Sequence, residues 1–525
     1  MDVFCYAPAG FDGHIVHVEV DIRRGIPGLE IVGLPDNAVR ESRERVRVAT
    51  TNSGYKFPRD RILVNLAPAD VRKEGSSFDL PIAIAILAAA GNIAGQRANR
   101  ILAVGELQLS GEVRGVRGVL AAVSAGLDHE IDDFVVPEVN VAEAEALGAG
   151  HIIGVGTLRQ CVETLCGALR RVACERGAWN DPSDRTKKET EVGVENEAID
   201  RNSSVLDFRD LRGQNPLKRA LVIAAAGRHH VMAFGPPGSG KTMAAQRLPS
   251  ILPFLRKEES IELTRIHSLA GLLGANEGLI KRPSLRIPHH SATPEGIIGG
   301  GKSIRPGEIS LAHHGILLLD EAPEFKKNLL QCLREPIESG RVDLARAGSV
   351  YWFPARFQLV LTANPCPCGN LGRDNGVCIC TRFEVQKYWK RLGGALLDRI
   401  DIRVPVKPVS SEDLLDPISL SSEQMRGDVC RAREVQLKRS GDGVKGYNAD
   451  MNTGDIARFC GLDRQCAGKL SEIVRKMSLS SRACHSILKV ARTIADIEKS
   501  DCILKDHLYE AVGLRRYGDT NFFWN

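Results

Sequence analysis

The sequence lacks the features that mark membrane and secreted proteins. Its longest uninterrupted apolar run, Leu80 to Gly91, has 12 residues and is too short to span a bilayer. Residues Met1 to Cys5 lack the basic start and apolar core of a signal peptide. Fourteen cysteines in such a chain favour reduced thiols or a metal site over a disulfide framework. We therefore expect a cytoplasmic protein that has no membrane partner.

The chain also lacks a strong excess of charge of either sign. Lysine and arginine number 70 against 65 aspartates and glutamates, a net charge of +5. This excess is too small to identify a nucleic-acid-binding protein from net charge, so any such site must be a local patch. A length of 525 residues exceeds what one hydrophobic core supports and favours three or four domains.

The first domain is predicted to be a compact mixed α/β unit over residues 1–170. Residues 15–22 alternate between apolar and polar side chains, the pattern of a half-buried strand. Further strands are predicted at 29–32, 62–66, 101–106, 108–113 and 134–136, and helices at 37–50, 80–91 and 119–127.

A charged segment over residues 171–204 is predicted to be a mobile linker. Between Asp181 and Arg201, 11 of 21 residues are charged and large apolar side chains are almost absent. Such a segment cannot bury enough apolar surface to offset its ordering entropy. A solvated helix is the alternative.

The second half of the chain predicts a parallel sheet followed by helices. Strand and helix patterns alternate over residues 205–440, as in α/β domains. Three helix candidates remain in residues 441–525, of which Ser480 to Glu498 is the clearest, because it has an apolar stripe at helical spacing. The predicted fold class is therefore α/β and multidomain.

The stretch from Phe234 to Thr242 has the spacing of a phosphate-binding loop that leads from a buried strand into a helix. Its glycines allow backbone N–H groups to face a phosphate, and the helix directs the positive end of its dipole at the same anion. Lys241 is predicted to reach the β- and γ-phosphates of ATP, and the Thr242 hydroxyl to bind Mg2+. The complete predicted loop is Gly235, Pro236, Pro237, Gly238, Ser239, Gly240, Lys241 and Thr242.

Two later strands end in residues suited to hydrolysis. Gly315 to Glu321 is an apolar run that ends in two acids. Asp320 is predicted to hold Mg2+ through water, and Glu321 to polarise the attacking water. The strand over 357–362 runs into Asn364, which would help to orient that water if this strand lies between the other two. The alternatives are a core strand with solvated acids and a turn-forming asparagine.

Two arginines are candidates for contact with the γ-phosphate. Arg399 follows a short helix candidate, and its own nucleotide would lie on the far side of the sheet, so a neighbouring subunit's γ-phosphate is the expected target. The alternative is a surface ion pair with Asp398 or Asp401. Arg482 begins the clearest C-terminal helix and is a candidate for γ-phosphate contact from a lid, with a structural salt bridge as the alternative.

Four cysteines within 15 residues form two C-x-C pairs, Cys366 with Cys368 and Cys378 with Cys380. Four thiolates can surround one Zn2+ tetrahedrally, although structural sites usually have two or more residues between paired ligands. Structural zinc and free thiols both remain open.

In combination, the phosphate loop, LLLDE, LTANPCPCG, LLDRID and SSRACHSILKVARTIAD resemble the AAA+ ATPases of the magnesium-chelatase-like group. The whole chain except the linker resembles the ComM/YifB family. The resemblance implies that Gly213 and Gln214 lie near the adenine. It also implies that Arg346, on a hairpin over 341–356, and Lys302 and Arg305, in an inserted loop, face the central channel of a ring. Cations there would bind phosphates with little sequence preference, and two ordinary surface loops are the alternative.

The first domain resembles the proteolytic domain of Lon. Ser77 falls at the position of the catalytic serine, and Leu120 occupies the position where the lysine is expected. A serine without a base is a weak nucleophile, so we expect a Lon-like fold without peptidase activity. In the resembling family, and in the RadA helicase, this domain serves assembly or DNA contact.

The resemblance therefore implies a ring-forming ATPase, expected to be a hexamer, that uses ATP and Mg2+ to move single-stranded or branched DNA. Branch migration of recombination intermediates, which helps incoming strands to integrate, is the implied process. A protein-remodelling motor, as in magnesium chelatase, is the first alternative. An ATP-dependent protease is the second.

Overall fold

The computed structural model describes residues 1–93, 100–167, 206–301, 304–346, 349–373, 376–409, 420–440 and 446–517. The predicted linker over 171–204 and the predicted DNA contact Lys302 lie outside these ranges. No helix in the described ranges is long and apolar enough to cross a membrane.

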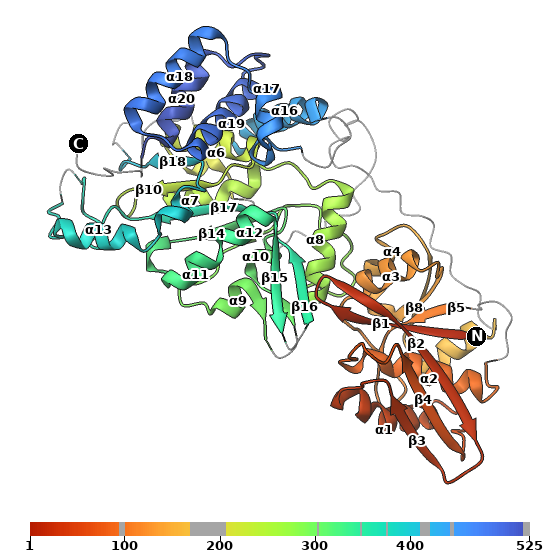
Figure 1. Ribbon diagram of the computed structural model, residues 1–525. Helices are drawn as coiled ribbons and strands as arrows, with labels where there is room; N and C mark the ends of the chain where they lie inside the picture. Colours follow the sequence, from red (N-terminus) through yellow and green to blue (C-terminus); the bar gives the residue numbers. More distant parts are fainter. Residues whose placement is uncertain are drawn as a thin grey trace.

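The first domain is built on a seven-stranded mixed sheet with helices packed on it (Figure 1). The strand order is β3-β4-β2-β1-β5-β8-β9, in which β1 to β2 and β2 to β4 are antiparallel and the other neighbours are parallel. α2 is apolar on all sides and lies in the core of this domain, which explains its uniform sequence. The elements are β1 (Asp2–Ala9), β2 (Asp12–Arg23), β3 (Gly28–Val32), α1 (Asn37–Asn52), β4 (Arg61–Ala67), α2 (Asp79–Ala89), β5 (Arg100–Ala103), α3 (Val119–Asp128), β8 (Asp133–Pro137), α4 (Val141–Glu145), β9 (His151–Val155) and α5 (Leu158–Leu165).

The predicted strand over 108–113 is wrong. The structure has a small hairpin there, in which β6 (Glu106–Leu107) pairs with β7 (Val113–Arg114). The Gln108 N–H donates to the Glu112 carbonyl, and Gly111 has a φ of 91°. This positive φ, which favours glycine, turns the chain back where the alternating pattern suggested extension.

The second domain contains a five-stranded parallel sheet in the order β11-β14-β17-β10-β18. Alternate residues of β10 face different cores: Val231 and Ala233 belong to one, and Met232 and Phe234 to the other. Burial on both faces explains the continuous apolar runs. The strands are β10 (Val231–Phe234), β11 (Leu285–Arg286), β14 (Ile316–Leu319), β17 (Gln358–Ala363) and β18 (Ile402–Pro405); the helices are α6 (Asn215–Gly227), α7 (Lys241–Arg247), α8 (Lys257–Ala270), α9 (Pro294–Ile298), α10 (Glu308–Leu311), α11 (Lys327–Cys332), α12 (Arg334–Ser339), α13 (Arg382–Lys390) and α14 (Gly394–Leu397).

The helices at the C-terminal end of the chain, drawn in blue in Figure 1, cover one side of this domain. They are α16 (Ser422–Ser440), α17 (Thr453–Phe459), α18 (Arg464–Met477), α19 (Ser481–Ile497) and α20 (Lys505–Arg515). Four of them follow residue 441 in the described part of the chain, where three were predicted. α19 buries Ile487, Ala491, Ile494 and Ala495, as its apolar stripe predicts.

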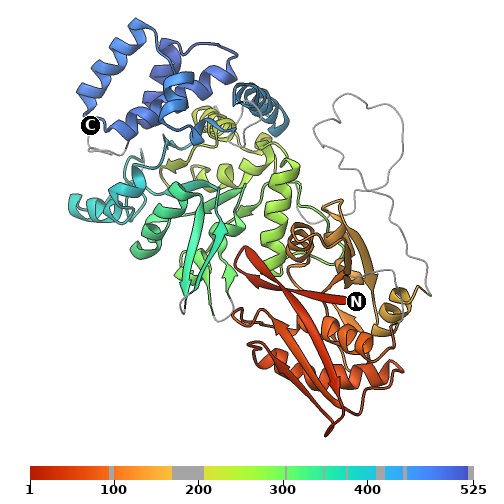
Figure 2. The same cartoon turned by 45° about the vertical axis from the view of Figure 1, so that its right-hand side comes forward.

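The two domains meet where the β1–β2 turn reaches β16 (Ser349–Pro354), the partner of β15 (Arg341–Arg346). The Phe11 N–H donates to the Trp352 carbonyl at 2.8 Å, and the Arg265 guanidinium lies 4.4 Å from the Phe11 ring centroid. Nearby, the Gly118 N–H donates to the Ser268 hydroxyl at 2.9 Å. In Figures 1 and 2 the red hairpin points at β16 and α8. The first domain therefore contacts the hairpin that was predicted to face a channel.

Candidate nucleotide-binding site

The predicted phosphate loop connects β10 to α7. Gly240, with a φ of 87°, is the N-cap of α7, and Gly238 has a φ of 78°. A side chain at Gly235 would collide with the Val406 carbonyl, where a Cβ would lie 2.0 Å from the oxygen. These glycines permit the tight path by which the loop enters the helix.

Lys241 lies within the loop, and its side chain contacts the loop backbone. Its ammonium donates to the carbonyls of Gly235 and Pro236, each at 2.8 Å, and lies 3.4 Å from the Asn364 side-chain oxygen. Burial lowers the pKa of Lys241 to about 8, although the carboxylates of Asp320 and Glu321 act in the opposite direction. The site therefore holds a cation whose charge changes just above neutral pH.

The two acids after β14 occupy different environments. Asp320 accepts a hydrogen bond from the Thr242 hydroxyl at 2.8 Å and another from the Thr362 hydroxyl. Glu321 is exposed and has a φ of 52°, a left-handed conformation that is costly for a residue other than glycine. The Glu321 N–H donates to the Thr362 hydroxyl at 2.9 Å. Thr362 thus joins both acids and fixes the turn that directs Glu321.

Asn364 lies beside Glu321, because β17 lies between β10 and β14. Its amide nitrogen is 3.5 Å from a Glu321 carboxylate oxygen. The strand order that the prediction for Asn364 required is therefore present. Lys241, Thr242, Asp320, Glu321 and Asn364 converge at the carboxyl ends of three neighbouring parallel strands, where α/β folds bind ligands.

Gln214 connects the start of the second domain to the phosphate loop. Its side-chain amide donates to the Ser239 carbonyl at 3.0 Å and to the Lys407 carbonyl at 2.6 Å. Gly213 and Gln214 both have positive φ, 59° and 56°. Gln214, which the family resemblance places near the adenine, thus contacts the phosphate loop and the segment after β18.

Arg399 and Arg482 converge on one carboxylate. Arg399 lies 2.7 Å from a Glu338 oxygen, and Arg482 donates to the same oxygen at 2.6 Å. These hydrogen bonds, that of Arg482 first, lower the pKa of Glu338. Neither Asp398 nor Asp401 is the main partner of Arg399. Asp398 lies 3.1 Å from Arg515 and Asp401 lies 3.3 Å from His229.

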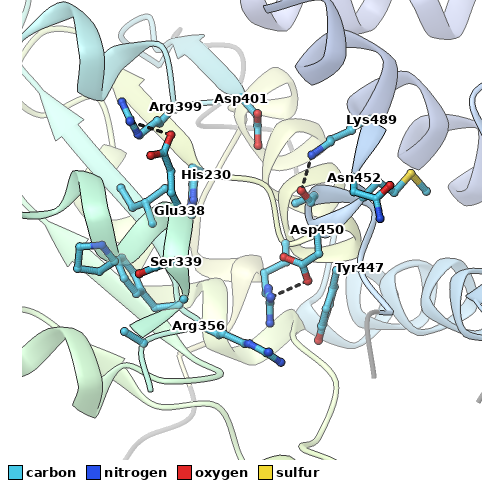
Figure 3. Close-up of a pocket in the computed structure, with 18 of the residues that line it drawn as sticks. His230, Glu338, Ser339, Arg356, Arg399, Asp401, Tyr447, Asp450, Asn452 and Lys489 are labelled. Atoms are coloured by element: carbon cyan, nitrogen blue, oxygen red, sulfur yellow. Dashed lines mark hydrogen bonds and ion pairs between the residues drawn. The ribbon is translucent and has the colours of Figure 1, made fainter. Parts of the chain in front are cut away.

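Both arginines line a cavity of about 730 Å³ between the parallel sheet and the C-terminal helices (Figure 3). Its lining includes His230, which immediately precedes β10, and Phe357, which immediately precedes β17. The cavity therefore lies at the amino ends of these strands. No described residue of 235–242 lines it. A strand of four residues, at about 3.3 Å per residue, separates the cavity at the amino edge of the sheet from the phosphate loop at its carboxyl edge by about 13 Å.

The two segments predicted to face a channel contact each other. β15 and β16 form the predicted hairpin, in which Arg346 pairs with Ser349, although residues 347 and 348 of the turn lie outside the described ranges. The Arg346 guanidinium donates to the Gly301 carbonyl in the inserted loop. Arg305 is exposed on β13 (Arg305–Pro306), which pairs with β12 (Gly299–Gly300). Arg346 and Arg305 are thus on adjoining segments.

The four clustered cysteines come together beside the phosphate loop. Every pair of their sulfur atoms lies within 4.8 Å. Gly369, between Cys368 and Asn370, packs on the phosphate loop so closely that a Cβ would lie 2.9 Å from Pro237 Cδ. The cysteine loop is therefore one wall of the candidate site.

Ser77 has no hydrogen bond to an amine in the described part of the chain. Leu120 is buried on α3, where its N–H donates to Glu143 at 2.8 Å. Lys73 is also buried, and its ammonium donates to the Pro68 carbonyl. The described residues therefore offer no serine–lysine pair at Ser77.

Sequence reasoning missed Thr362 and Glu338. Thr362 is part of the LTANP motif, but only the pairing of β17 with β14 reveals that its hydroxyl joins the two acids. Glu338 belongs to no motif, and its role depends on contacts across 61 and 144 residues of sequence. No local pattern could have identified Glu338.

Known protein families and relatives match almost the whole chain. Residues 18–140 match the family described as subunit ChlI of Mg-chelatase, residues 207–414 match magnesium chelatase, subunit ChlI, and residues 419–515 match its C-terminal part. The chain is 39% identical to the competence protein ComM of Haemophilus influenzae over 98% of this chain and 97% of that protein. It is 40% identical to YifB of Escherichia coli over 97% of this chain and 96% of that protein. The magnesium-chelatase 38 kDa subunit of Rhodobacter capsulatus is 28% identical over 31% of this chain and 51% of that subunit.

Proposed function

Because this chain belongs to the ComM/YifB family of magnesium-chelatase-like AAA+ proteins, we propose that it is a ring-forming ATPase that moves DNA strands. Its proposed parts are a Lon-like first domain over 1–170, a linker over 171–204, an ATPase core over 205–440 and a helical lid over 441–525. The proposed substrate is single-stranded or branched DNA, and the proposed process is branch migration during recombination and integration of incoming DNA.

The observation that carries the ATPase proposal is the convergence of five side chains at one edge of the parallel sheet. In this proposal the loop over 235–242 binds the phosphates, with Lys241 at the β- and γ-phosphates. Thr242 and Asp320, now joined by a 2.8 Å hydrogen bond, hold Mg2+ at the same place. These residues fit the ion, because hydroxyl and carboxylate oxygens are the ligands that Mg2+ prefers. Glu321 accepts a proton from the attacking water, and Asn364 orients that water.

Arg399 and Arg482 are proposed to act on ATP bound by the neighbouring subunit. Both lie at the amino edge of the sheet, and the phosphate loop lies at the carboxyl edge. Neither can therefore reach its own nucleotide without a large rearrangement. In a head-to-tail ring, the amino edge of the sheet in one subunit faces the carboxyl edge of the sheet in the next subunit. The two arginines of one subunit then lie near the phosphate loop of its neighbour. We expect six subunits.

Glu338 provides a connection between hydrolysis and DNA. It binds both arginines and lies three residues before Arg341, the first residue of β15. A change in the nucleotide that displaces the arginines would pull on α12 and move the hairpin that carries Arg346. Arg346, Arg305 and Lys302 are the proposed phosphate contacts.

The test is ATP-driven migration of a synthetic four-way junction by the purified protein, compared with Glu321→Gln. The variant should bind ATP and junction but migrate nothing, because it lacks the carboxylate that activates water. Junction binding should weaken steeply as salt increases, since phosphate contacts release counterions. If Glu321→Gln migrates the junction at the wild-type rate, the proposal is wrong.

Protein remodelling is the alternative function, and the match to magnesium-chelatase subunits favours it. The alignment with the 38 kDa subunit covers 31% of the chain, whereas the alignment with ComM covers 98% of it. An ATPase activity that responds to no DNA would support the alternative. Proteolysis has less support, because no base in the described ranges is paired with Ser77.

A further inference from the structure

The loop between β17 and α13 is held together around four sulfur atoms. Cys366 Sγ lies 3.4 Å from Cys368 Sγ and 3.7 Å from Cys378 Sγ, and Cys368 Sγ lies 3.7 Å from Cys378 Sγ. Cys380 completes a set whose sulfurs all lie within 4.8 Å of one another. We propose that these four cysteines bind one Zn2+ ion, and that the ion holds the loop against the phosphate loop.

The spacing of the sulfurs is that of a tetrahedral metal site. Four thiolates at the usual Zn–S distance of about 2.3 Å lie about 3.8 Å from one another. A disulfide would bring two sulfurs to about 2.05 Å, so the cluster is not an oxidised pair. All-sulfur tetrahedral sites select zinc or iron–sulfur clusters, and the compact set of four fits a single ion.

The four sulfurs lie at the margin of the hydrophobic core of the second domain. Cys366 is buried, but the other three cysteines are only half-buried. Their neighbours Val377 and Ile379 have 83% and 81% of their surface exposed, so the loop has little apolar core of its own.

The position of the cluster indicates what the ion stabilises. Cys366 is two residues after Asn364, and Gly369 packs on Pro237 of the phosphate loop. Cys380 precedes Thr381, the N-cap of α13. From α13, the Trp389 indole N–H donates to the Pro365 carbonyl at 3.1 Å. Zinc would thus tie α13, Asn364 and the phosphate loop into one unit. Only this consequence for catalysis rests on the proposed function.

Metal analysis of the purified full chain, prepared without chelator, tests the site directly. We expect one zinc per chain. The double variant Cys368→Ser/Cys378→Ser should lose it, whereas Cys166→Ser/Cys502→Ser, which alters two exposed cysteines elsewhere, should keep it. In the wild-type protein, a mercurial reagent should release one zinc per chain to a metal indicator. Replacement by Co2+ should give the visible absorption of a tetrahedral thiolate site, so the test does not depend on the variant folding.

ATPase activity is a separate readout. Loss of zinc should lower kcat at least tenfold, because Gly369 and Asn364 would no longer be held against the phosphate loop. The inference is overturned if the wild-type protein contains no zinc or contains iron in its place. It is also overturned if the Cys368→Ser/Cys378→Ser variant retains the zinc content of the wild type. One zinc per chain in a protein without ATPase activity would support the zinc site and refute the proposed ATPase function. ATPase activity in a protein without zinc would refute the zinc site and leave the proposed ATPase function intact.

Discussion

Replacement of Thr362 by valine should slow ATP hydrolysis without weakening ATP binding. The Thr362 side chain is 1% exposed, and its hydroxyl is the only link between the Glu321 N–H and the Asp320 carboxylate that the described residues provide. Valine keeps the shape of threonine and removes this hydroxyl. Glu321 then loses the bond that holds its left-handed backbone, and Asp320 loses one of its two hydroxyl donors.

The size of the effect follows from the bonds that are lost. A hydrogen bond to a charged group contributes about 1.5–3 kcal/mol, and a loss of about 1.4–2.8 kcal/mol from the transition state slows a reaction about 10- to 100-fold. We expect kcat to fall by that factor. The KM for ATP should change less than about threefold, because Lys241 and the loop glycines are untouched.

Thr362→Ser is the matched control, because it keeps the hydroxyl and removes only a methyl group. Steady-state ATPase assays of the two variants, with melting temperatures to confirm folding, decide the matter. The reasoning is refuted if Thr362→Val keeps wild-type kcat, or if Thr362→Ser is impaired to the same extent.

Two other predictions concern charge and domain contact. ATP affinity should fall as pH rises through about 8, by up to tenfold per pH unit, because Lys241 loses the proton that attracts the phosphates. Binding titrations above pH 7.5 measure this decline, which should be absent in Lys241→Arg; a flat profile for the wild type would contradict it. Phe11→Ala should loosen the contact between the first domain and β16, because it removes the ring that contacts Trp352 and Arg265. Hydrogen exchange at residues 350–353 should then accelerate, whereas Phe4→Ala, at a ring that contacts His17 and Arg100 instead, should leave it unchanged.

The strands that carry the candidate site were predictable from the sequence. β10, β14 and β17 are buried on both faces, so each appears as an apolar run that ends in polar residues. Their parallel pairing then brings Lys241, Asp320 and Asn364 to one edge. β1 was missed, because its residues do not alternate strictly between apolar and polar, and because Pro8 interrupts the pattern.

Contacts between distant segments could not be predicted from local patterns. Glu338 is an ordinary surface acid by its sequence, and only the fold of the chain places it between Arg399 and Arg482. The alternative for Arg399, an ion pair with Asp398 or Asp401, assumed partners that are neighbours in sequence. In the structure those acids bind Arg515 and His229 instead, because α20 and the segment before β10 approach from elsewhere in the chain.

The proposed mechanism requires that one subunit supplies its arginines to ATP held by the next. Mixing Lys241→Ala with Arg399→Ala protein tests this claim directly. Each variant alone should be inactive, and an equal mixture should recover activity near about one quarter of the wild-type rate, because one random head-to-tail interface in four joins an intact loop to an intact arginine. No recovery on mixing, or full activity of Arg399→Ala alone, would contradict the account.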